Sequence, residues 1–391
     1  MLPLFYVISH YSNLPFRAWE QRKFIEIINR LSKTSNSSIL PKVEYEDIIA
    51  EEGRLNKDIS NKFDSRKGIL FQPKNILYGK LRPYLKNWLY PDFKGVAVGD
   101  FWVFEAIEAT PRFIYNLIQS DSYQKVANDT AGTKMPRSDW TKVSNSSFFI
   151  PKESSEQKRI GTFFKQLDDT IALHQRKLDT LKQMKKGLLQ QMFPKSEEDV
   201  PKIRFADFDE EWYQRKLGEE FEKINERNDG SFGKTHWISV AKMYFVEPNK
   251  VLSNNIDTRT YVMRKGDIAF EGHSNTDFKF GRFVANDIGP GIVSELFPVY
   301  RHKTNYDNNY WKNAIQLEHI MAPIYSKSIT SSGNSSNKLD SKHFLNQKIY
   351  IADFEEQEKI GSIFKQLDNT IILYQNKLNK FDILKKAYLQ T

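Results

Sequence analysis

One segment occurs twice in this chain of 391 residues, at a constant offset of 200 positions. The stretches 156–190 and 356–390 are identical at 19 of 35 aligned positions, without a gap. A period this long excludes a solenoid of short repeats. It predicts a duplicated unit, in which one domain and one copy of the segment are followed by a second domain and the second copy.

The repeated segment has the apolar spacing of a long helix. Apolar residues recur at alternating steps of four and three, and neither copy contains proline. This spacing is typical of a coiled coil, and a helix of ~38 residues would be ~57 Å long. Two such helices in one chain can pair antiparallel. The predicted seam residues are Ile160, Phe164, Leu167, Ile171 and Leu178 in the first copy and Ile360, Phe364, Leu367, Ile371 and Leu378 in the second.

Polar residues interrupt the seam at His174 and Lys185, and the second copy departs at the same positions. We interpret His174 as a packed or register-setting residue rather than a metal ligand. Outer apolar residues such as Phe163 and Leu173 widen the stripe, which calls for a further neighbour. That neighbour could be the chain's own domain or another protein.

The duplication sets the expected domain organisation. We predict a first domain over residues 1–151, a helix over 152–193, a linker over 194–202, a second domain over 203–352 and a second helix over 353–391. Each domain shows β-rich runs followed by a helix, which we predict over 110–127 and 307–328. A shorter echo supports the alignment, because "WEQRK" near the start of the first domain recurs as "WYQRK" in the second.

Composition limits the classes of function. The chain has no cysteine, which excludes disulfides, zinc fingers and thiol catalysis and favours a cytoplasmic location. No apolar run reaches the ~18 residues of a membrane span, and the start of the chain lacks the features of a signal peptide. The net charge is +9; residues 1–193 carry 30 Lys and Arg against 21 Asp and Glu, while residues 194–391 carry 28 of each. This balance fits a polyanionic partner, or an ordinary solvated surface.

Common catalytic motifs are missing. We find no GxxxxGK[ST] loop, no GxSxG, no HExxH, no glycine-rich methyl-donor motif and no Asp/Asn-Pro-Pro-aromatic tetrad, and the seven histidines are scattered. Asp168 and Asp169 are adjacent on the predicted helix and therefore point to different faces, as expected for a solvated surface. The sequence favours recognition over catalysis.

Four segments carry residues suited to nucleic acid. "YGKLRPYLKNW" interleaves basic residues with Tyr78, Tyr84 and Trp88, a mixture that suits phosphate contact and stacking, although a plain strand with a basic face would look the same. "GTKMPR", "EGHSNTDFKFGR" and "SSGNSSNK" add Asn, Ser, Lys and Arg, which contact bases and backbones. The candidate DNA-binding residues are Lys80, Arg82, Lys86, Lys134, Arg137, His273, Asn275, Lys279, Arg282, Ser335, Ser336, Asn337 and Lys338. We predict no catalytic residue and no metal site.

The pattern resembles the specificity subunit of type I restriction–modification systems. The resemblance is carried by the duplicated helix starts "EQKRIGTFFKQLDDTI" and "EQEKIGSIFKQLDNTI", together with "LYGKLRPYL", "GTKMPR" and "RFADFDEEWYQRKLG", and it covers nearly the whole chain. It implies two mixed α/β target recognition domains joined by two long antiparallel coiled-coil helices, an α+β fold with a pseudo-two-fold internal duplication. Each domain would read one half of a bipartite, asymmetric DNA site, and the helices would set the spacer.

The resemblance also implies partners and cofactors. Two modification subunits would dock on the helices and domains and methylate adenine, and restriction subunits would join them. S-adenosylmethionine, ATP and Mg²⁺ would then be bound by those partners and none by this chain. The residues leave two alternatives open: a self-contained DNA-modifying enzyme that uses acids such as Asp64 or Asp100, and a two-headed scaffold that binds only proteins.

Overall fold

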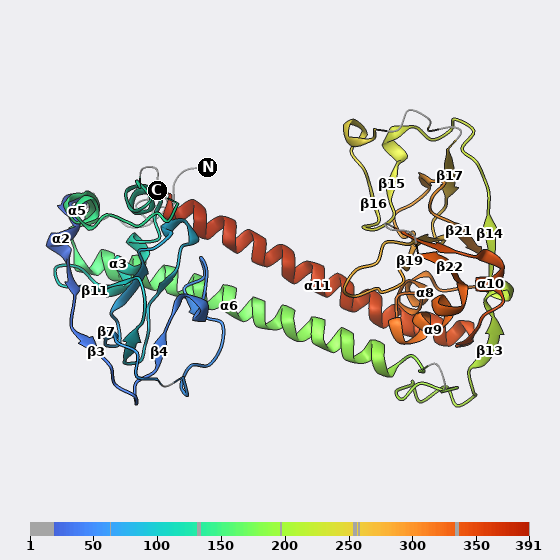
Figure 1. Cartoon of the computed structure of the whole chain (residues 1–391), viewed down its shortest axis with the longest axis horizontal. Helices are drawn as coiled ribbons and strands as arrows, with labels where there is room; N and C mark the ends of the chain where they lie inside the picture. Colours follow the sequence, from blue (N-terminus) through green and yellow to red (C-terminus); the bar gives the residue numbers. More distant parts are fainter. Residues whose placement is uncertain are drawn as a thin grey trace, which may run out of the picture. The chain divides into compact units, whose positions relative to one another are not determined.

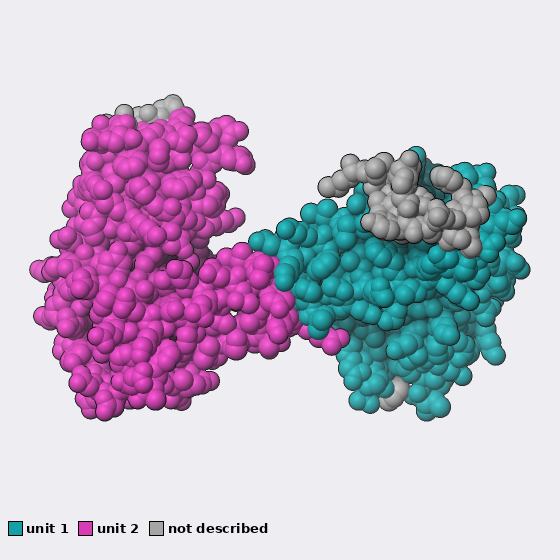
Figure 2. All heavy atoms as spheres, turned by 180° about the vertical axis from the view of Figure 1, so that it is seen from behind, with its two compact units in different colours: residues 1–175, 376–391 teal, residues 176–375 magenta. Residues whose placement is uncertain are grey.

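The computed structural model describes residues 19–62, 64–130, 134–195, 198–252, 256, 259–332 and 336–390. It divides into two compact units (Figure 2). Unit 1 comprises residues 1–175 and 376–391, and unit 2 comprises residues 176–375. Each unit therefore contains one globular domain and parts of the two long helices, α6 (Ser154–Gln191) and α11 (Phe354–Leu389) (Figure 1).

Within each unit, the two long helices run antiparallel. In unit 1, the ring of Phe163 on α6 lies 5.3 Å from that of Tyr388 on α11, and further along α6 the ring of His174 lies 5.3 Å from that of Phe381. Higher numbers on one helix thus meet lower numbers on the other. The predicted antiparallel pairing is confirmed within the units, and His174 is a packing residue there.

The predicted seam residues face inward along both helices. On α6, Phe164, Leu167 and Leu178 are buried, while Ile160 and Ile171 are partly buried. On α11 the buried ones are Ile360, Phe364, Leu367 and Leu378, and Ile371 is partly buried.

The lysines that interrupt the seam form ion pairs between the helices. Lys385 Nζ lies 2.8 Å from Asp168 Oδ1 in unit 1, and Lys185 Nζ lies 2.6 Å from Asp368 Oδ1 in unit 2. Asp168 also accepts from Arg112 at 2.9 Å, with its side chain 22% exposed. The prediction that Asp168 belongs to a merely solvated surface is therefore wrong, because it joins two helices and the domain.

Short strands and helices make up the domain of unit 1. The bounds are β1 Trp19–Lys23, α2 Phe24–Ile27, β2 Ile28–Leu31, β3 Thr34–Ser35, β4 Lys42–Val43, η1 Tyr45–Asp47, β5 Ile48–Ile49, β6 Arg54–Leu55, β7 Gly68–Phe71, β8 Ile76–Gly79, η2 Pro83–Leu85, β9 Trp88–Leu89, β10 Gly95–Ala97, β11 Phe101–Ala106, α3 Pro111–Leu117, α4 Asp121–Ala127, α5 Trp140–Asn145 and β12 Ser147–Pro151. The strands pair in the orders β2-β11-β8-β9, β3-β7-β10-β4, β1-β12 and β5-β6.

The central sheet of this domain separates two apolar cores. Along β8, Ile76 and Tyr78 pack with residues of α3 and α4, while Leu77 between them packs with residues of β4 and β7. This alternation follows from the two-residue period of a strand. The domain is thus a mixed α/β layer structure, as predicted.

The helix predicted over 110–127 is two helices. α3 ends at Leu117, and Ser120 caps α4 by accepting a hydrogen bond from Tyr123 N at 3.3 Å. The matching segment of unit 2 also divides. A serine side chain that competes for backbone donors favours a new helix start, which apolar spacing alone does not reveal.

Unit 2 repeats this plan with different sequences. Its elements are β13 Tyr213–Lys216, α7 Leu217–Glu220, β14 Phe221–Ile224, η3 Lys234–His236, β15 Ile238–Ser239, β16 Tyr244–Phe245, η4 Pro248–Lys250, β17 Thr260–Met263, β18 Ile268–Glu271, β19 Arg282–Ala285, β20 Gly291–Ser294, β21 Val299–His302, α8 Asn308–Ala314, α9 Glu318–Ser328, β22 Ile329–Ser332, β23 Asn337–Leu339, α10 Ser341–Leu345 and β24 Lys348–Ile351. The strands pair as β14-β21-β18-β19, β17-β20, β15-β16, β13-β24 and β22-β23. The pair β13-β24 matches β1-β12, which accounts for the "WEQRK" echo.

The start of each repeated helix is tied to its own domain in the same way. Gln157 donates to the carbonyl of Pro151 at 2.9 Å and accepts from Thr110 N at 2.8 Å. Gln357 likewise donates to Ala352 O at 2.9 Å and accepts from Asp307 N. The identical glutamines therefore fix the angle at which each long helix leaves its domain.

The neighbouring glutamates, Glu156 and Glu356, each accept a hydrogen bond from the tryptophan that begins the "WEQRK" or "WYQRK" segment. Trp19 Nε1 donates to Glu156 at 3.2 Å, and Trp212 Nε1 donates to Glu356 at 2.9 Å. The duplicated Glu-Gln pair is thus a structural joint. No helix within the described residues is long and apolar enough to cross a membrane.

A buried histidine makes the stability of unit 2 sensitive to pH. Both ring nitrogens of His302 are buried without a hydrogen-bond partner among the described residues, its ring stacks 3.8 Å from that of Tyr306, and burial lowers its pKa to about 3. An unfolded histidine has a pKa of about 6.5, so below that pH the unfolded state binds a proton that the folded state excludes.

We expect the free energy of unfolding to fall by about 2 kcal/mol between pH 7 and pH 5 through this residue. His302→Phe should remove that part of the pH dependence. Urea unfolding of both chains at pH 7, 6 and 5 measures it, and the exposed His343→Gln serves as control. An unchanged slope in His302→Phe would contradict the assignment.

Candidate nucleic-acid interface

Two of the predicted basic segments of unit 1 lie side by side. Arg82 N donates to Pro136 O at 2.7 Å, and Ser138 N donates to Lys80 O at 2.8 Å, with an antiparallel bridge between Leu81 and Arg137. We call residues 80–86 and 134–138 the unit 1 loop pair. It brings together Lys80, Arg82, Lys86, Lys134 and Arg137, all of which are partly or fully exposed.

Carboxylates hold three of these cations in place. Asp100 lies 3.0 Å from Arg137 and 3.7 Å from Lys80, and Glu51 lies 3.2 Å from Lys86. Because these pairs are solvated, each contributes little to stability and restricts the orientation of the cation. A phosphate could displace such a carboxylate, so these pairs suit a site that exchanges an internal anion for an external one.

Tyr45 supports the loop pair from below. Its hydroxyl donates to Asp100 O at 2.6 Å and accepts from Leu81 N at 3.1 Å. Burial raises the pKa of Tyr45, so the hydroxyl remains a donor at neutral pH. Sequence reasoning missed this residue, since nothing near "VEYED" indicates a contact with segments 36 and 55 positions away.

The stacking prediction fails for two of the three aromatic residues. Tyr78 is 0% exposed and Trp88 is 3% exposed, and both belong to the core beneath the loop pair. Tyr84, on the turn η2, is 55% exposed. Strand alternation directs every second residue inward, so only the residue on the turn remains available to a ligand.

Unit 2 places its own two segments together in the same manner. Asn337 N donates to Gly272 O at 2.9 Å, and Asn337 Nδ2 donates to Ser274 Oγ at 3.1 Å. We call residues 272–282 and 336–338 the unit 2 loop pair. A side chain at Gly272 would lie 2.2 Å from Asn337 O, so the close approach requires glycine. Ser335, also predicted to bind DNA, lies outside the described residues.

Some predicted contacts of unit 2 are used within the protein. Asn275 Oδ1 accepts from Asp277 N and Phe278 N, both at 2.9 Å, and shapes the loop. Arg282 donates to Ala241 O at 2.6 Å and lies over the ring of Phe278. His273 contacts Glu271. Lys279, Ser336, Asn337 and Lys338 lie at the partly or fully exposed edge of the loop pair.

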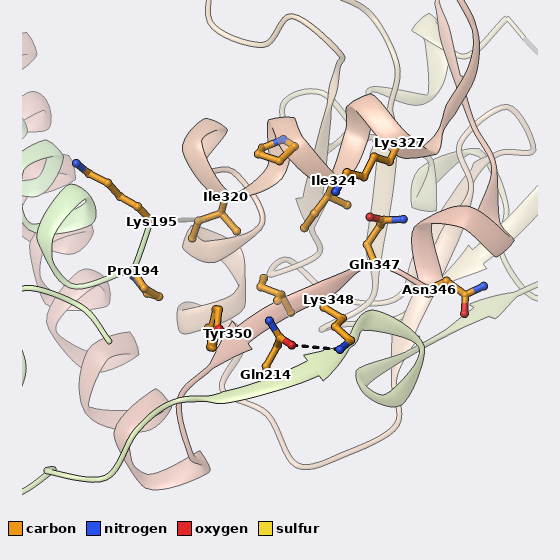
Figure 3. Close-up of a pocket in the computed structure, with 12 residues that line it drawn as sticks. Pro194, Lys195, Gln214, Ile320, Ile324, Lys327, Asn346, Gln347, Lys348 and Tyr350 are labelled. Carbon is orange, nitrogen blue, oxygen red and sulfur yellow. Dashed lines mark hydrogen bonds between the residues drawn. The ribbon is translucent and has the colours of Figure 1, made fainter. Parts of the chain in front are cut away.

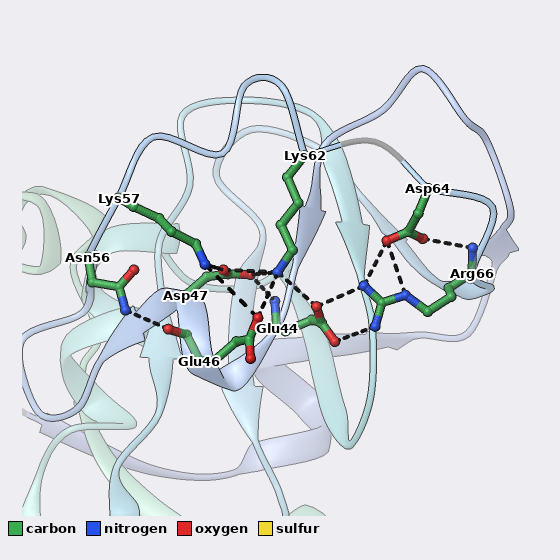
Figure 4. Close-up of polar contacts among 8 residues, drawn as sticks. All are labelled: Glu44, Glu46, Asp47, Asn56, Lys57, Lys62, Asp64 and Arg66. Atoms are coloured by element: carbon green, nitrogen blue, oxygen red, sulfur yellow. Dashed lines mark hydrogen bonds and ion pairs between the residues drawn. The ribbon is translucent and has the colours of Figure 1, made fainter.

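A cluster of charged side chains in unit 1 is paired internally (Figure 4). Asp47 is 0% exposed and lies 2.7 Å from Lys62 and 3.0 Å from Lys57. Arg66 lies 2.6 Å from Glu44 and 2.7 Å from Asp64. The Arg66 guanidinium holds the pKa of the Asp64 carboxyl below its usual value, so this acid is a poor proton donor. These ion pairs join residues 44–47 to residues 57–66, the loop that precedes β7.

A groove of unit 2 offers no catalytic pair among its described lining residues (Figure 3). It measures about 500 Å³ and lies between α9, β24 and the segment after α6. Lys195, Lys327 and Lys348 line it, and Lys348 donates to Gln214 at 3.2 Å. Among the described residues that line it, none is a carboxylate or a histidine. Across the described ranges, no group of three or more His, Asp or Glu side chains could hold a metal ion.

The chain is similar to one protein family model and to several solved structures. Residues 18–183 match the family model of the type I restriction modification DNA specificity domain. The S subunit of a type I restriction–modification system from M. genitalium is similar over 100% of this chain and 98% of its own, with a TM-score of 0.59 and 14% identity. No curated protein sequence matches the chain significantly.

Two further solved structures are similar along the chain. One belongs to work on complex assembly and conformational transition of the type I R-M system, covers 97% of this chain and 98% of its own, and has a TM-score of 0.55 at 16% identity. The other is the HsdS subunit from Thermoanaerobacter tengcongensis, which covers 97% of both chains with a TM-score of 0.47 and 18% identity. The likeness to the first and to the M. genitalium subunit shows a common fold.

Proposed function

We propose that each loop pair of the chain reads one half of a bipartite, asymmetric DNA site. The match of residues 18–183 to the family model of the type I restriction modification DNA specificity domain supports this proposal. The observation that carries the proposal is the duplication of the loop pair. Backbone hydrogen bonding joins the two segments of each pair, with two bonds in unit 1 and one in unit 2, just beyond the equivalent strands β8 and β18, while the exposed side chains differ. Two loop pairs with a similar backbone arrangement but different exposed side chains suit two different half-sites.

The long helices would set the spacer between the half-sites. α6 has 38 residues and α11 has 36, which corresponds to ~57 Å and ~54 Å of helix. A length of ~57 Å equals ~17 base pairs at ~3.4 Å each. The ion pairs and glutamine joints favour a stiff spacer. Exposed apolar residues on α11, among them Ile372, Leu373 and Ile383, would provide a surface for modification subunits.

Under this proposal the chain supplies specificity and its partners supply chemistry. Two modification subunits would bring S-adenosylmethionine and methylate adenine, and restriction subunits would bring ATP, Mg²⁺ and cleavage. Both acids considered for a self-contained enzyme, Asp64 and Asp100, are engaged in ion pairs with arginine. Methylation or cleavage by the purified chain alone would overturn this division of labour.

The decisive experiment exchanges domains. Methylated adenines are first mapped in a host that carries the whole system, which identifies the site. We expect exchange of residues 19–151 for those of a relative to change one half-site only, and exchange of residues 203–352 to change the other. A change of both half-sites by either exchange contradicts the proposal. Binding with no salt dependence and no sequence preference would instead favour a protein scaffold.

A further inference from the structure

The turn at the tip of the unit 1 loop pair is unusually constrained. Residues Pro83–Leu85 form η2, and the residues on both sides, Arg82 (φ 49°) and Lys86 (φ 53°), adopt left-handed conformations that are unfavourable for side chains with a Cβ. Lys86 N donates to Pro83 O at 2.9 Å, and Lys86 O accepts from Glu51 N at 3.0 Å. Such conformations persist only where surrounding contacts enforce them, and they concentrate at functional sites.

The constrained turn presents apolar side chains to solvent. Tyr84 is 55% exposed and Leu85 is 41% exposed, and across the backbone ladder Met135 is 51% exposed. Pro83, which precedes Tyr84 and Leu85, is buried. Scattered exposed apolar residues need no explanation, but here three of them gather at the tip of one loop pair.

Cations surround this apolar tip. Arg82 is exposed, Arg137 is 57% exposed, and the Lys86 side chain is 36% exposed. Basic groups around an apolar tip suit a surface where phosphates flank an apolar group. In the major groove of DNA, that apolar group is the 5-methyl of thymine, which the minor groove does not display.

The unit 2 loop pair has a different tip. Its residues 273–277 are polar and exposed, and its two aromatic residues, Phe278 and Phe280, are half-buried beneath Arg282 and Lys279. In the described parts of the two loop pairs, the exposed apolar tip therefore belongs to unit 1. Any apolar readout should be confined to one half-site.

We propose that Tyr84 and Leu85 contact thymine methyl groups in the half-site read by unit 1, and that they determine specificity there. This inference rests on the proposed function. It assigns base contact to the apolar residues of η2 and leaves phosphate contact to the cations around them. Uracil lacks only the methyl group of thymine, so replacing one by the other isolates the predicted contact.

The test measures binding of the full chain, assembled with its modification subunits, to duplexes carrying the mapped site. Each thymine of the unit 1 half-site is replaced in turn by uracil, and we expect at least one replacement to weaken binding about threefold to fivefold. The double variant Tyr84→Ala/Leu85→Ala should bind less tightly and lose this sensitivity. Tyr84→Phe, which keeps the ring, should retain the sensitivity and shows that the turn still folds.

Control experiments distinguish the thymine contact from the proposed reading of half-sites, on which it rests. Uracil in the other half-site should affect the double variant and the original chain equally, and Tyr213→Ala, an exposed tyrosine of unit 2, should leave the uracil effect unchanged. Sequence-specific binding with no uracil effect in the unit 1 half-site, or an effect that survives in the double variant, overturns the inference alone. Absence of any sequence preference overturns the proposed function and the inference together.

Discussion

Replacing Glu356 with alanine is expected to lower the free energy of unfolding of unit 2 by about 3–5 kcal/mol. The Glu356 side chain is 1% exposed and accepts from Arg204 through both oxygens, at 2.9 and 2.8 Å, and from Trp212 Nε1 at 2.9 Å. Removal of the carboxylate leaves Arg204, whose side chain is only 14% exposed, without the partner that accepts two of its hydrogen bonds, and leaves the buried indole without an acceptor. Breaking a buried ion pair from one side is costly because the other charge stays buried.

The duplication provides a matched control for this change. Glu156 occupies the equivalent position in unit 1, but among the described residues its Oε2 has no hydrogen-bond partner, and Trp19 donates to its Oε1 at 3.2 Å. Glu156→Ala should therefore cost about 1 kcal/mol. Urea unfolding gives the magnitude, and amide hydrogen exchange shows which unit opens. Equal losses in the two variants would contradict the role given to Arg204.

The sequence predicted the long helices well because their signal is local and repeated. Heptad spacing, the absence of proline and the offset of 200 identify both helices and most buried seam residues. The polar breaks at Lys185 and Lys385 could not be explained from the pattern. Their partners, Asp368 and Asp168, lie on the opposite helix, and pairing across helices depends on register.

The candidate interface could be predicted only in pieces. "YGKLRPYL" and "GTKMPR" were each recognisable, but their contact depends on two backbone hydrogen bonds between residues more than 50 positions apart, which no local pattern encodes. The burial of Tyr78 and Trp88 was missed for a related reason. An aromatic residue in a strand has the same composition whichever face it occupies, and only the sheet decides which face is covered.

Gly361→Ala should destabilise unit 2, whereas the equivalent Gly161→Ala should leave unit 1 unchanged or slightly more stable. A methyl group at Gly361 would lie 1.9 Å from Asp307 Oδ1, 2.7 Å from its Cγ and 3.0 Å from Tyr310 N. That same Oδ1 accepts from Tyr310 N at 2.7 Å and caps α8. Displacing the cap lowers the free energy of unfolding by about 1 kcal/mol, and overpacking lowers it by about 1–3 kcal/mol. The higher helix propensity of alanine raises it by about 1 kcal/mol. The net expectation is a loss of about 1–3 kcal/mol.

At Gly161 the cost of overpacking is smaller relative to the gain in helix propensity. The added methyl would lie 3.1 Å from Cβ and Cγ of Arg112, and the nearest backbone atom is 3.6 Å away. A side chain can shift by a few tenths of an ångström, so the gain in helix propensity of about 1 kcal/mol is largely kept. Thermal unfolding of both variants, with hydrogen exchange to identify the unit, compares them. Opposite signs support a joint that is tight at α8 and looser at α3. Equal destabilisation would show that both domains meet their helix equally closely, and the two joints would then be equivalent in packing as well as in sequence.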